Sequence, residues 1–268
     1  MGHPIVTLTT DFGASDEYVG AMKGVLLSSL ADLQIVDITH NIPPGDTQQA
    51  SYLLEGMVPN FPAEAVHLVV VDPGVGSPRE ILAVEHPLGL FVAPDNGVLT
   101  PYIDSGSTVS VERPDLYQGT TGETFHGRDR MAPVAAALAS GTALADLGPE
   151  TVAPTRHQPL LLKRSETRIE GCVIHIDHFG NAITNIPWSW VQELSGKVCT
   201  WLGEQPVCRQ VTHYQQLTNG HPGFLQGSRG TIELALNCQS MAETYKLKRG
   251  DSVRVQSQLP PVGQPKID

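Results

Sequence analysis

The first 150 residues alternate between short apolar runs and longer stretches with helical spacing. Runs rich in β-branched residues predict strands at residues 4–10, 33–39 and 65–71, and two more within 80–97 that are joined at "HPLG". Apolar positions three and four residues apart predict helices at residues 16–30, 47–57 and 129–141, the first with Asp16 as its N-cap. Strands that alternate with helices in this way predict an α/β sheet covered on both faces.

The pattern changes after residue 149. The stretch "GPETVAPTRHQP" (148–159) is rich in Pro and polar residues and lacks periodicity, which is typical of a linker. Beyond it, Gly, Pro and Asn separate five strand-like runs: "RIEGCVIHID", "AITNIP", "KVCTWL", "GTIELALN" and "DSVRVQS". We therefore expect an N-terminal α/β/α domain over residues 1–155. A C-terminal all-β domain follows over residues 160–268, as a small antiparallel barrel or sandwich.

Composition argues against nucleic-acid and membrane partners. The 268 residues carry a formal net charge of −11, which argues against nucleic-acid binding because that needs a basic face. No apolar run approaches the ~20 residues of a membrane helix. The N-terminal "MGHPIVTLTTDFG" lacks the basic, apolar and cleavage segments of a secretory signal. We expect a cytoplasmic protein without nucleic-acid or membrane partners.

The cysteines lie in the last hundred residues, at Cys172, Cys199, Cys208 and Cys238. None of them forms a CxxC pair. We expect buried free thiols, and the alternatives are a disulfide or a metal site.

Two predicted strands end on an aspartate followed by a glycine-containing turn. "IVTLTTD" ends at Asp11, and "HLVVVD" ends at Asp72. Ligands of open α/β sheets bind beyond the carboxyl ends of strands, where glycines let the backbone approach closely. Aspartate is also a common turn former, so the spacing alone leaves both interpretations open.

The segment "GETFHGRDRMAPVAAAL" (122–138) places His126 in a loop just before a predicted helix. A histidine titrates near neutrality and can handle a proton there. The alternative, of equal weight, is a histidine that hydrogen-bonds locally in its loop. We expect the neighbouring Arg128, Asp129 and Arg130 to be surface charges or a helix cap.

Two polar turns of the C-terminal domain offer charges and amides. They are "IHIDHFGNAITNI" (174–186) and "GSRGTIELALN" (227–237). An amide donates and accepts at once, so it can read an adenine edge. Taken singly, both segments favour plain turns with polar residues. Their candidate side chains are Asp177, Phe179, Asn181, Ser228, Arg229 and Asn237.

Carboxylates and a histidine that are able to ligate a divalent ion occur at Asp11, Asp72, His126 and Asp177. The sequence has no HxH, HExxH or DxD pair, and Arg79 close to Asp72 would repel a cation. We therefore expect no metal.

Six segments follow one another in the order of a known family. They are "TLTTDFGASDEYVGAMKG", "VVVDPGVGSPRE", "APDNG", "FHGRDRMAPVAA", "IDHFGNAITNI" and "GSRGTIELALN". Over residues 4–255 the chain resembles the S-adenosyl-L-methionine (SAM) hydroxide adenosyltransferases, or SAM hydrolases, which are relatives of the SAM-dependent fluorinase and chlorinase. The resemblance implies an N-terminal α/β/α domain, a C-terminal antiparallel β-barrel and a homotrimer. SAM would lie between the N-terminal domain of one subunit and the C-terminal domain of the next.

The resemblance also implies the chemistry. The Asp–Arg–His set of the hydrolytic members falls on Asp72, Arg79 and His126. Water, activated by these groups, would attack ribose C5′ of SAM in line with the sulfonium. The products would be adenosine and L-methionine, and no metal or other cofactor would be needed.

The substrate-binding residues are carried over motif by motif. The resemblance gives Asp11 the ribose hydroxyls and gives Asp16 and Asp177 the methionine portion. The adenine-reading amide falls on Asn237, beside the backbone of Cys238. The remaining matched positions are Phe179, Asn181, Ser228 and Arg229.

This chain departs from the halogenases in two places. It reads "IDHFGN" where they read "IDHPFGN", and only about thirty residues separate "PDNG" from "FHG", so their extra N-terminal loop is absent. The aromatic contacts to the ligand have no firm match, with Tyr18, Tyr52, Trp188 and Phe224 as candidates. Both the missing loop and the Asp–Arg–His set favour water over halide. The alternatives are a halogenase and a SAM or adenosine sensor without turnover.

Overall fold

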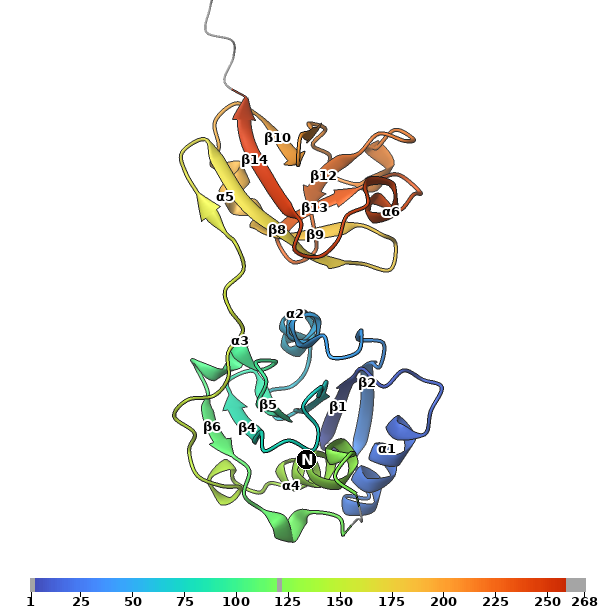
Figure 1. Cartoon of the computed structure of the whole chain (residues 1–268), viewed down its shortest axis with the longest axis vertical. Helices are drawn as coiled ribbons and strands as arrows, with labels where there is room; N and C mark the ends of the chain where they lie inside the picture. The colour runs from blue at the N-terminus through green and yellow to red at the C-terminus, as the bar shows by residue number, and fades with distance from the viewer. Residues whose placement is uncertain (1–2, 120–121, 259–268) are drawn as a thin grey trace, which may run out of the picture. The chain divides into compact units, whose positions relative to one another are not determined.

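A computed structural model describes residues 3–119 and 122–258. The chain divides into two compact units, Met1–Gln158 and Pro159–Asp268 (Figure 1). Among the described residues, no helix is long and apolar enough to cross a membrane.

The N-terminal unit is built on a six-stranded sheet in the order β2-β1-β3-β5-β4-β6. Its strands are β1 (Ile5–Thr10), β2 (Gln34–Thr39), β3 (Val66–Val70), β4 (Ile81–His86), β5 (Gly89–Pro94) and β6 (Ser107–Ser110). β1 pairs in parallel with β2 and β3, and β3 pairs in parallel with β5. β4 runs antiparallel to both of its neighbours, β5 and β6.

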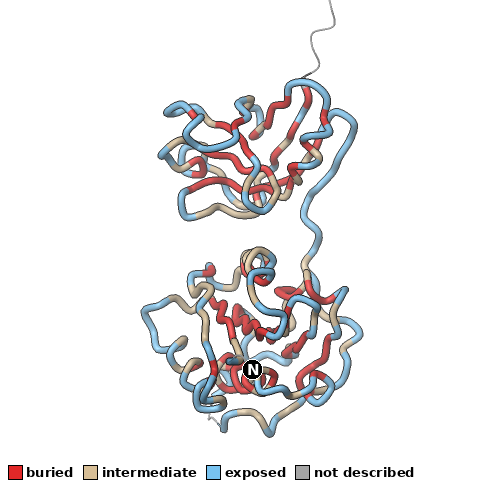
Figure 2. Tube along the Cα trace, turned by 180° about the vertical axis from the view of Figure 1, so that it is seen from behind, coloured by how far each residue is buried: buried red, intermediate tan, exposed pale blue. Residues whose placement is uncertain are grey.

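Helices cover both faces of this sheet, as predicted (Figure 1). α1 (Tyr18–Ser29) and α4 (Ala132–Ala139) pack on one face, whereas α2 (Thr47–Met57) and α3 (Thr100–Ile103) pack on the other. Short 3₁₀ turns lie at Val58–Asn60, Pro114–Leu116 and Leu144–Asp146. Side chains alternate along a strand, so in β3 Leu68 joins the first core and Val69 the second. The strand is therefore buried on both faces, and Figure 2 shows buried segments inside the unit with exposed segments around them.

Helix starts differ from the prediction in two places. α1 begins at Tyr18 with Glu17 as its N-cap, so the assignment of Asp16 as the cap is wrong. Gly13 N donates to His40 O, which ties the loop after β1 to the end of β2. This loop extends to residue 17. The helix predicted from residue 129 begins earlier, as a π-helical turn over Gly127–Met131 that continues into α4.

The C-terminal unit is a nearly closed antiparallel barrel in the order β11-β10-β14-β8-β9-β13-β12, with β7 paired to β8. Its core includes Ile169, Trp188, Phe224, Leu234 and Val255. Its helices are short, namely α5 (Trp188–Gln192), α6 (Met241–Tyr245) and the 3₁₀ turn Tyr214–Gln216. The strands are β7 (Lys163–Arg164), β8 (Arg168–Ile176), β9 (Ala182–Pro187), β10 (Lys197–Leu202), β11 (Gln205–Val207), β12 (Gly223–Gln226), β13 (Thr231–Ala235) and β14 (Ser252–Gln258). The unit is therefore a barrel and not a sandwich.

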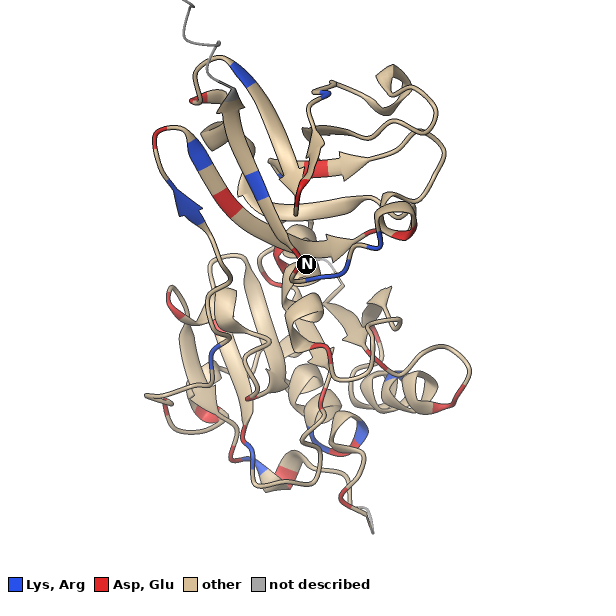
Figure 3. Cartoon of the chain, turned by 45° about the horizontal axis from the view of Figure 1, so that its top comes forward, with Lys and Arg blue, Asp and Glu red and all other residues tan. Residues whose placement is uncertain are grey.

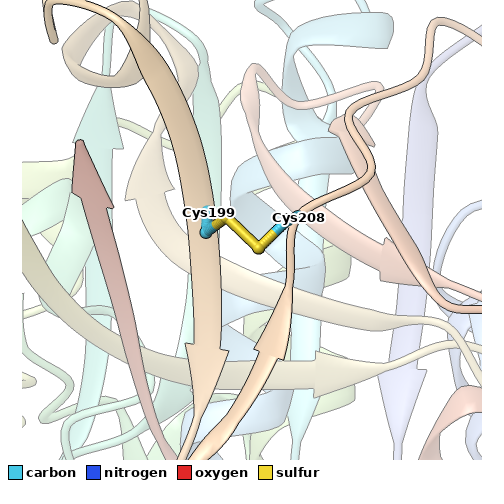
Figure 4. The surroundings of a disulfide bond; sticks show 2 residues. All are labelled: Cys199 and Cys208. Atoms are coloured by element: carbon cyan, nitrogen blue, oxygen red, sulfur yellow. A yellow bond between two sulfur atoms is a disulfide. The ribbon is translucent and has the colours of Figure 1, made fainter. Parts of the chain in front are cut away.

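A disulfide joins two of the cysteines, which corrects the expectation of free thiols for that pair. β10 pairs with β11 so that Thr200 lies opposite Val207, and the next positions along the ladder are Cys199 and Cys208. Their Cα atoms lie 4.1 Å apart and their sulfurs are bonded (Figure 4). Cys172 is buried and Cys238 is exposed, and both are free thiols.

Candidate functional site

The carboxyl ends of β1 and β3 form one wall of a pocket. β1 lies between β2 and β3, so the chain leaves β1 on one side and returns on the other, and ligands of open α/β sheets bind at such a switch point. Thr10 pairs with Val70, so Asp11 and Asp72 follow at neighbouring strand ends. Both carboxylates line a pocket of about 380 Å³. The structure therefore brings together the two aspartates that the sequence placed after strands.

Three aromatic rings gather beside these carboxylates. Tyr18 and Phe125 meet edge-on with ring centroids 5.2 Å apart, and Phe12 lies 5.6 and 5.8 Å from those two rings. All three line the same pocket, together with Glu17. Aromatic faces beside acidic groups favour a cationic ligand.

Asp72 and Arg79 form a buried ion pair across the "DPGVGSPR" turn. Arg79 Nε donates to Asp72 Oδ1 at 2.8 Å and to Oδ2 at 3.0 Å, and Arg79 Nη2 also donates to Oδ2. The side chains of Asp72 and Arg79 are 5% and 10% exposed, so this pair is not the solvated surface pair that sequence alone allows. Arg79 Nη1 is also buried, and no described residue accepts a hydrogen bond from it.

His126 extends this network from the other side of the pocket. Arg79 Nη2 lies 2.9 Å from His126 Nδ1, and His126 Nε2 lies 3.1 Å from Glu123 Oε2. A guanidinium only donates, so Nδ1 must accept, and hydrogen-bonding logic then places the ring proton on Nε2. Both of the earlier interpretations of His126 therefore apply: it lines the pocket, and it is hydrogen-bonded within its loop.

A close approach of the Gly127 backbone to the side chains of Val70 and Met22 positions His126. Gly127 lies against the end of β3, where a Cβ would come 3.0 Å from Val70 Cγ1 and 3.3 Å from Met22 Sδ. A larger residue would push the "FHG" loop away from the strand that carries Asp72. The glycine of this motif therefore keeps His126 within reach of Arg79.

The "PDNG" turn supports the same edge of the sheet. Asn96 Nδ2 donates to Val71 O, directly before Asp72, and Asn96 Oδ1 accepts from Val98 N. This turn therefore fixes the backbone from which Asp72 projects.

The remaining N-terminal candidates, Asp11 and Asp16, differ in whether they line the pocket. Asp11 lines the pocket, and its Oδ2 accepts a hydrogen bond from Gly45 N at 2.8 Å. Asp16 is exposed in the loop before α1 and is not among the described residues that line the pocket. The expected surface charges Arg128 and Arg130 pair with Asp129, which is buried, and with Glu123 respectively.

In the C-terminal unit, Asp177 organises the β8–β9 hairpin. Its Oδ1 accepts from Phe179 N at 2.9 Å and Asn181 N at 2.8 Å, and its Oδ2 accepts from Asn181 Nδ2 at 2.9 Å. Gly180 has a φ of 82° and packs on the next loop, where a Cβ would lie 2.8 Å from Ser240 Cα. Asn181 is buried, whereas the Phe179 ring is 75% exposed.

The other C-terminal candidates lie in two further loops. Ser228 and Arg229 are exposed in the turn between β12 and β13. Asn237 follows β13, and its Nδ2 donates to Leu217 O at 3.2 Å and Asn219 Oδ1 at 3.3 Å. Cys238 is exposed and has a φ of 54°, the left-handed region that non-glycine residues seldom adopt.

The turn that holds Arg229 and the hairpin of Asp177 influence shared titratable groups. Burial lowers the pKa of His175, and Arg229 lowers it further. Burial raises the pKa of Glu233, and Asp177 raises it further. Glu233 Oε1 accepts a hydrogen bond from the Tyr214 hydroxyl at 2.5 Å. These two loops therefore lie within electrostatic reach of one another.

No group of three potential metal ligands occurs within residues 3–119 and 122–258. Asp11, Asp72, His126 and Asp177 do not form such a group among these residues. Asp72 and His126 are instead bound to the same guanidinium.

Sequence reasoning missed one residue of the hydrogen-bond network and two of the pocket lining. Glu123, three residues before His126, holds its Nε2, and Phe12 and Glu17 belong to the lining. An acidic residue three positions before a histidine is a signal that sequence reading can use, because the two side chains meet where the chain turns between them. Tyr18 was only one of four unmatched aromatic candidates and is the one that lines the pocket.

Comparison with known proteins shows the family of the chain. The model of the SAM hydroxide adenosyltransferase N-terminal domain matches residues 6–148, and that of the C-terminal domain matches residues 171–254. A protein from Salinispora arenicola named (R)-S-adenosyl-L-methionine hydrolase is 35% identical and covers 94% of this chain and 97% of its own length. The protein of the same name from Thermus thermophilus is 37% identical, with 93% and 98% covered.

A more distant relative and a solved structure are also similar to this chain. A fluorinase from Nocardia brasiliensis is 28% identical, with 94% of this chain and 96% of its own length covered. The crystal structure of an uncharacterized conserved protein from Thermotoga maritima superposes with a TM-score of 0.86 at 30% identity, covering 94% of this chain and 99% of its own. With both domain models matched in order over most of its length, the chain belongs to the SAM hydroxide adenosyltransferase family.

Proposed function

We propose that this chain hydrolyses S-adenosyl-L-methionine to adenosine and L-methionine, by in-line attack of an activated water or hydroxide on ribose C5′. The observation that carries the proposal is the buried Asp72–Arg79–His126 network at the wall of a pocket with aromatic and acidic sides. The names of the relatives that are 35–37% identical support the same reaction.

The names of these relatives also specify the (R) configuration at the sulfonium. We propose that the substrate of this chain has the same (R) configuration. The two sulfonium epimers differ only in which substituent of sulfur points to each side. A pocket that fixes both the adenosine and the methionine end can therefore accept one epimer and exclude the other.

The mechanism uses a leaving group that is already activated. Attack of the water oxygen forms the C5′–O bond, while the C5′–S bond breaks and its electrons neutralise the sulfonium as the thioether of methionine. Hydroxide is the better nucleophile, and a donor aimed at its oxygen stabilises the charge in a site from which water is largely excluded. The buried Arg79 Nη1, with no acceptor among the described residues, suits that role.

The proton of the water goes to His126 in this proposal. Nδ1 carries the lone pair, and it becomes available when Arg79 Nη2 releases it. General-base assistance of this kind typically contributes about 10²–10⁴-fold. Asp72, bound through both carboxylate oxygens, keeps the guanidinium oriented while this happens.

Substrate binding is assigned by the family motifs. Asp11, at the edge of the pocket, holds the ribose hydroxyls, and Asp16 and Asp177 hold the methionine ammonium. Asn237 and the backbone of Cys238 read the adenine. Four further residues complete the proposed set: Phe179, Asn181, Ser228 and Arg229.

We further propose a cytoplasmic homotrimer that needs no metal or cofactor and binds neither nucleic acid nor membrane. The net charge of −11 supports the absence of a nucleic-acid partner. Figure 3 shows the lysine and arginine positions scattered along the chain and not gathered on one element. The trimer follows from the family resemblance. It is tested by sedimentation or light scattering of the purified chain.

The deciding experiment is product analysis. The pure protein is incubated with each SAM epimer in the presence of a chelator, and adenosine and methionine are separated by chromatography. We expect adenosine and methionine in equal amounts from the (R) epimer. Binding without turnover would instead indicate a sensor, and a 5′-halonucleoside formed in chloride or fluoride would indicate a halogenase.

A further inference from the structure

Glu123 ends the hydrogen-bond network that begins at Asp72. Its Oε2 lies 3.1 Å from His126 Nε2, and Arg130 Nη2 donates to the same oxygen. The network therefore runs from Asp72 through Arg79, His126 and Glu123 to Arg130, with the histidine ring between a guanidinium and a carboxylate. Neither Glu123 nor Arg130 is among the site residues that the family resemblance implies for this chain.

We propose that Glu123 is a positioning residue for His126. It binds the Nε2–H group, so that the lone pair of Nδ1 faces Arg79 and the reaction centre. The inference rests on the proposed function for its kinetic consequence, but its structural content is independent of it.

The donors and acceptors on either side of His126 fix its tautomer. An ionised carboxylate only accepts hydrogen bonds, and a guanidinium only donates them. His126 lies between one of each, so only one neutral tautomer satisfies both contacts. The opposite tautomer would place two hydrogens between Nδ1 and Arg79 Nη2, and two lone pairs between Nε2 and Glu123 Oε2.

Burial makes this requirement strict. The His126 side chain is 3% exposed, so water has little access to a mismatched ring nitrogen, and an unsatisfied buried polar atom is costly. Glu123 itself is 70% exposed, but two contacts restrain its carboxylate at the inner end. Arg130 is in turn held over the Tyr117 ring, with its guanidinium carbon 5.4 Å from the ring centroid.

The arrangement matches a general rule of catalysis. A base works best when a third group fixes its tautomer and stabilises its charged form. When Nδ1 takes the proton of the attacking water, the ring becomes a cation that still donates from Nε2 to the Glu123 carboxylate. Glu123 thus acts on the reaction through His126 and without touching the substrate.

The first test is spectroscopic. Long-range ¹H–¹⁵N correlation spectra of the full chain labelled at histidine report which ring nitrogen carries the proton, and the spectrum of His126→Gln identifies the His126 signals. We expect the Nε2–H tautomer. A protonated Nδ1 in the resting protein would overturn the inference, whether or not the protein turns SAM over.

The second test is kinetic, with a matched control. Glu123→Ala should lower kcat about tenfold and leave KM within about twofold, because a hydrogen bond to a charged group is lost without loss of a substrate contact. Glu123→Gln should recover most of this, since its carbonyl oxygen still accepts from Nε2. Glu64→Ala removes an exposed acid of the same unit and should change neither constant.

Two outcomes contradict the proposal. One is an unchanged kcat in Glu123→Ala, and the other is Glu123→Gln being as impaired as Glu123→Ala. Arg130→Gln gives an independent measurement, since it releases Glu123 without replacing it, and it should lower kcat in the same direction by a smaller factor. If the wild-type chain produces no adenosine, the proposed function fails, and the tautomer spectra still decide this inference.

Discussion

The two units hold their functional residues in different ways. In the N-terminal unit, Asp72, Arg79 and His126 bind one another through side chains, and His126 is 2% exposed. In the C-terminal unit, the side-chain hydrogen bonds of Asp177 to described residues lie within its own hairpin, and Phe179 two residues later is 75% exposed. The side chains of the first set are bound to one another before any ligand arrives, whereas the second set lies in loops whose Phe179, Ser228 and Arg229 are exposed.

This difference suggests a division of labour. Preorganised groups in a buried site act on the transition state and so determine kcat. Exposed groups on loops contact substrate and transition state alike, and such uniform binding appears mainly in KM. The following predictions test this division, beginning with the largest effect.

The largest effect is expected at Arg79. Arg79→Lys keeps a positive charge beside Asp72 but loses the planar fork that binds Asp72 and His126 together. We expect kcat to fall about 10²–10³-fold, as for loss of one preorganised donor, with adenosine affinity preserved. Turnover is measured by chromatography and affinity by calorimetry.

Arg113→Lys is the control for that prediction. Arg113 also binds an aspartate through a fork, at Asp115, but this pair is exposed and is not among the described residues that line the pocket. Its kcat should match the wild type. A similar loss in both variants, or a loss of adenosine affinity in Arg79→Lys alone, would remove the distinction between the two units.

A second prediction concerns acid stability of the N-terminal unit. His67 is fully buried in β3, its Nδ1 lies 2.8 Å from Thr7 Oγ1, and burial lowers its pKa to about 4. Because the folded pKa lies below the unfolded value of 6.5, stability is complete above pH 6.5 and is lost as the pH falls toward 4. The loss should reach about 3 kcal/mol at pH 4.

Urea unfolding at pH 7, 5.5 and 4 measures this effect. His67→Gln keeps a polar group near Thr7 but cannot titrate, so its free energy of unfolding should vary less between those pH values even if it is lower throughout. An equal pH dependence in both proteins would show that other groups cause the acid sensitivity. His157 of the same unit, whose pKa burial also lowers, would then be the next candidate.

The sequence predicted the regular parts of the fold because local and tertiary preferences agree there. The helix predicted at residues 47–57 has the same bounds as α2. At its start, Asp46 caps the helix by accepting a hydrogen bond from Gln49 N. The β3 run is apolar except at His67 and is buried on both faces. By contrast, β11 is three residues long and contains Pro206, so no periodicity marks it.

The missed disulfide follows from that missed strand. Cys199 and Cys208 lie opposite each other only because β11 pairs with β10, a contact that spacing in the sequence does not reveal. The candidate site likewise combines local features, which the sequence predicts, with contacts between distant segments, which it does not. Asp11 and Asp72 were found because strand ends are local features, but their meeting with His126 depends on the approach of Gly127 to β3. Without the family resemblance, the sequence left that meeting open.

A third prediction separates the units by stability. Cys199→Ser with Cys208→Ser removes a crosslink that closes a loop with a sequence separation of nine, so the C-terminal unit should lose about 2–3 kcal/mol. Differential scanning calorimetry with tryptophan fluorescence follows this unit selectively, because Trp188, Trp190 and Trp201 all lie in it. At 25 °C kcat should remain within about twofold. A large fall in kcat with folded protein would show that the barrel contributes to the chemistry itself.

The smallest effect is expected at Asp177, and it tests the division most directly. Asp177→Asn loses the negative charge proposed for the methionine ammonium, and one end of the amide can no longer accept from Phe179 N or Asn181. We expect KM to rise about tenfold and kcat to stay within about twofold. Asp251→Asn is the matched control, because Asp251 also accepts from a backbone N–H of its own turn, that of Lys248, and has no proposed ligand contact. If kcat falls in Asp177→Asn as much as in Arg79→Lys, the exposed hairpin belongs to the catalytic machinery, and local preorganisation does not distinguish the two units.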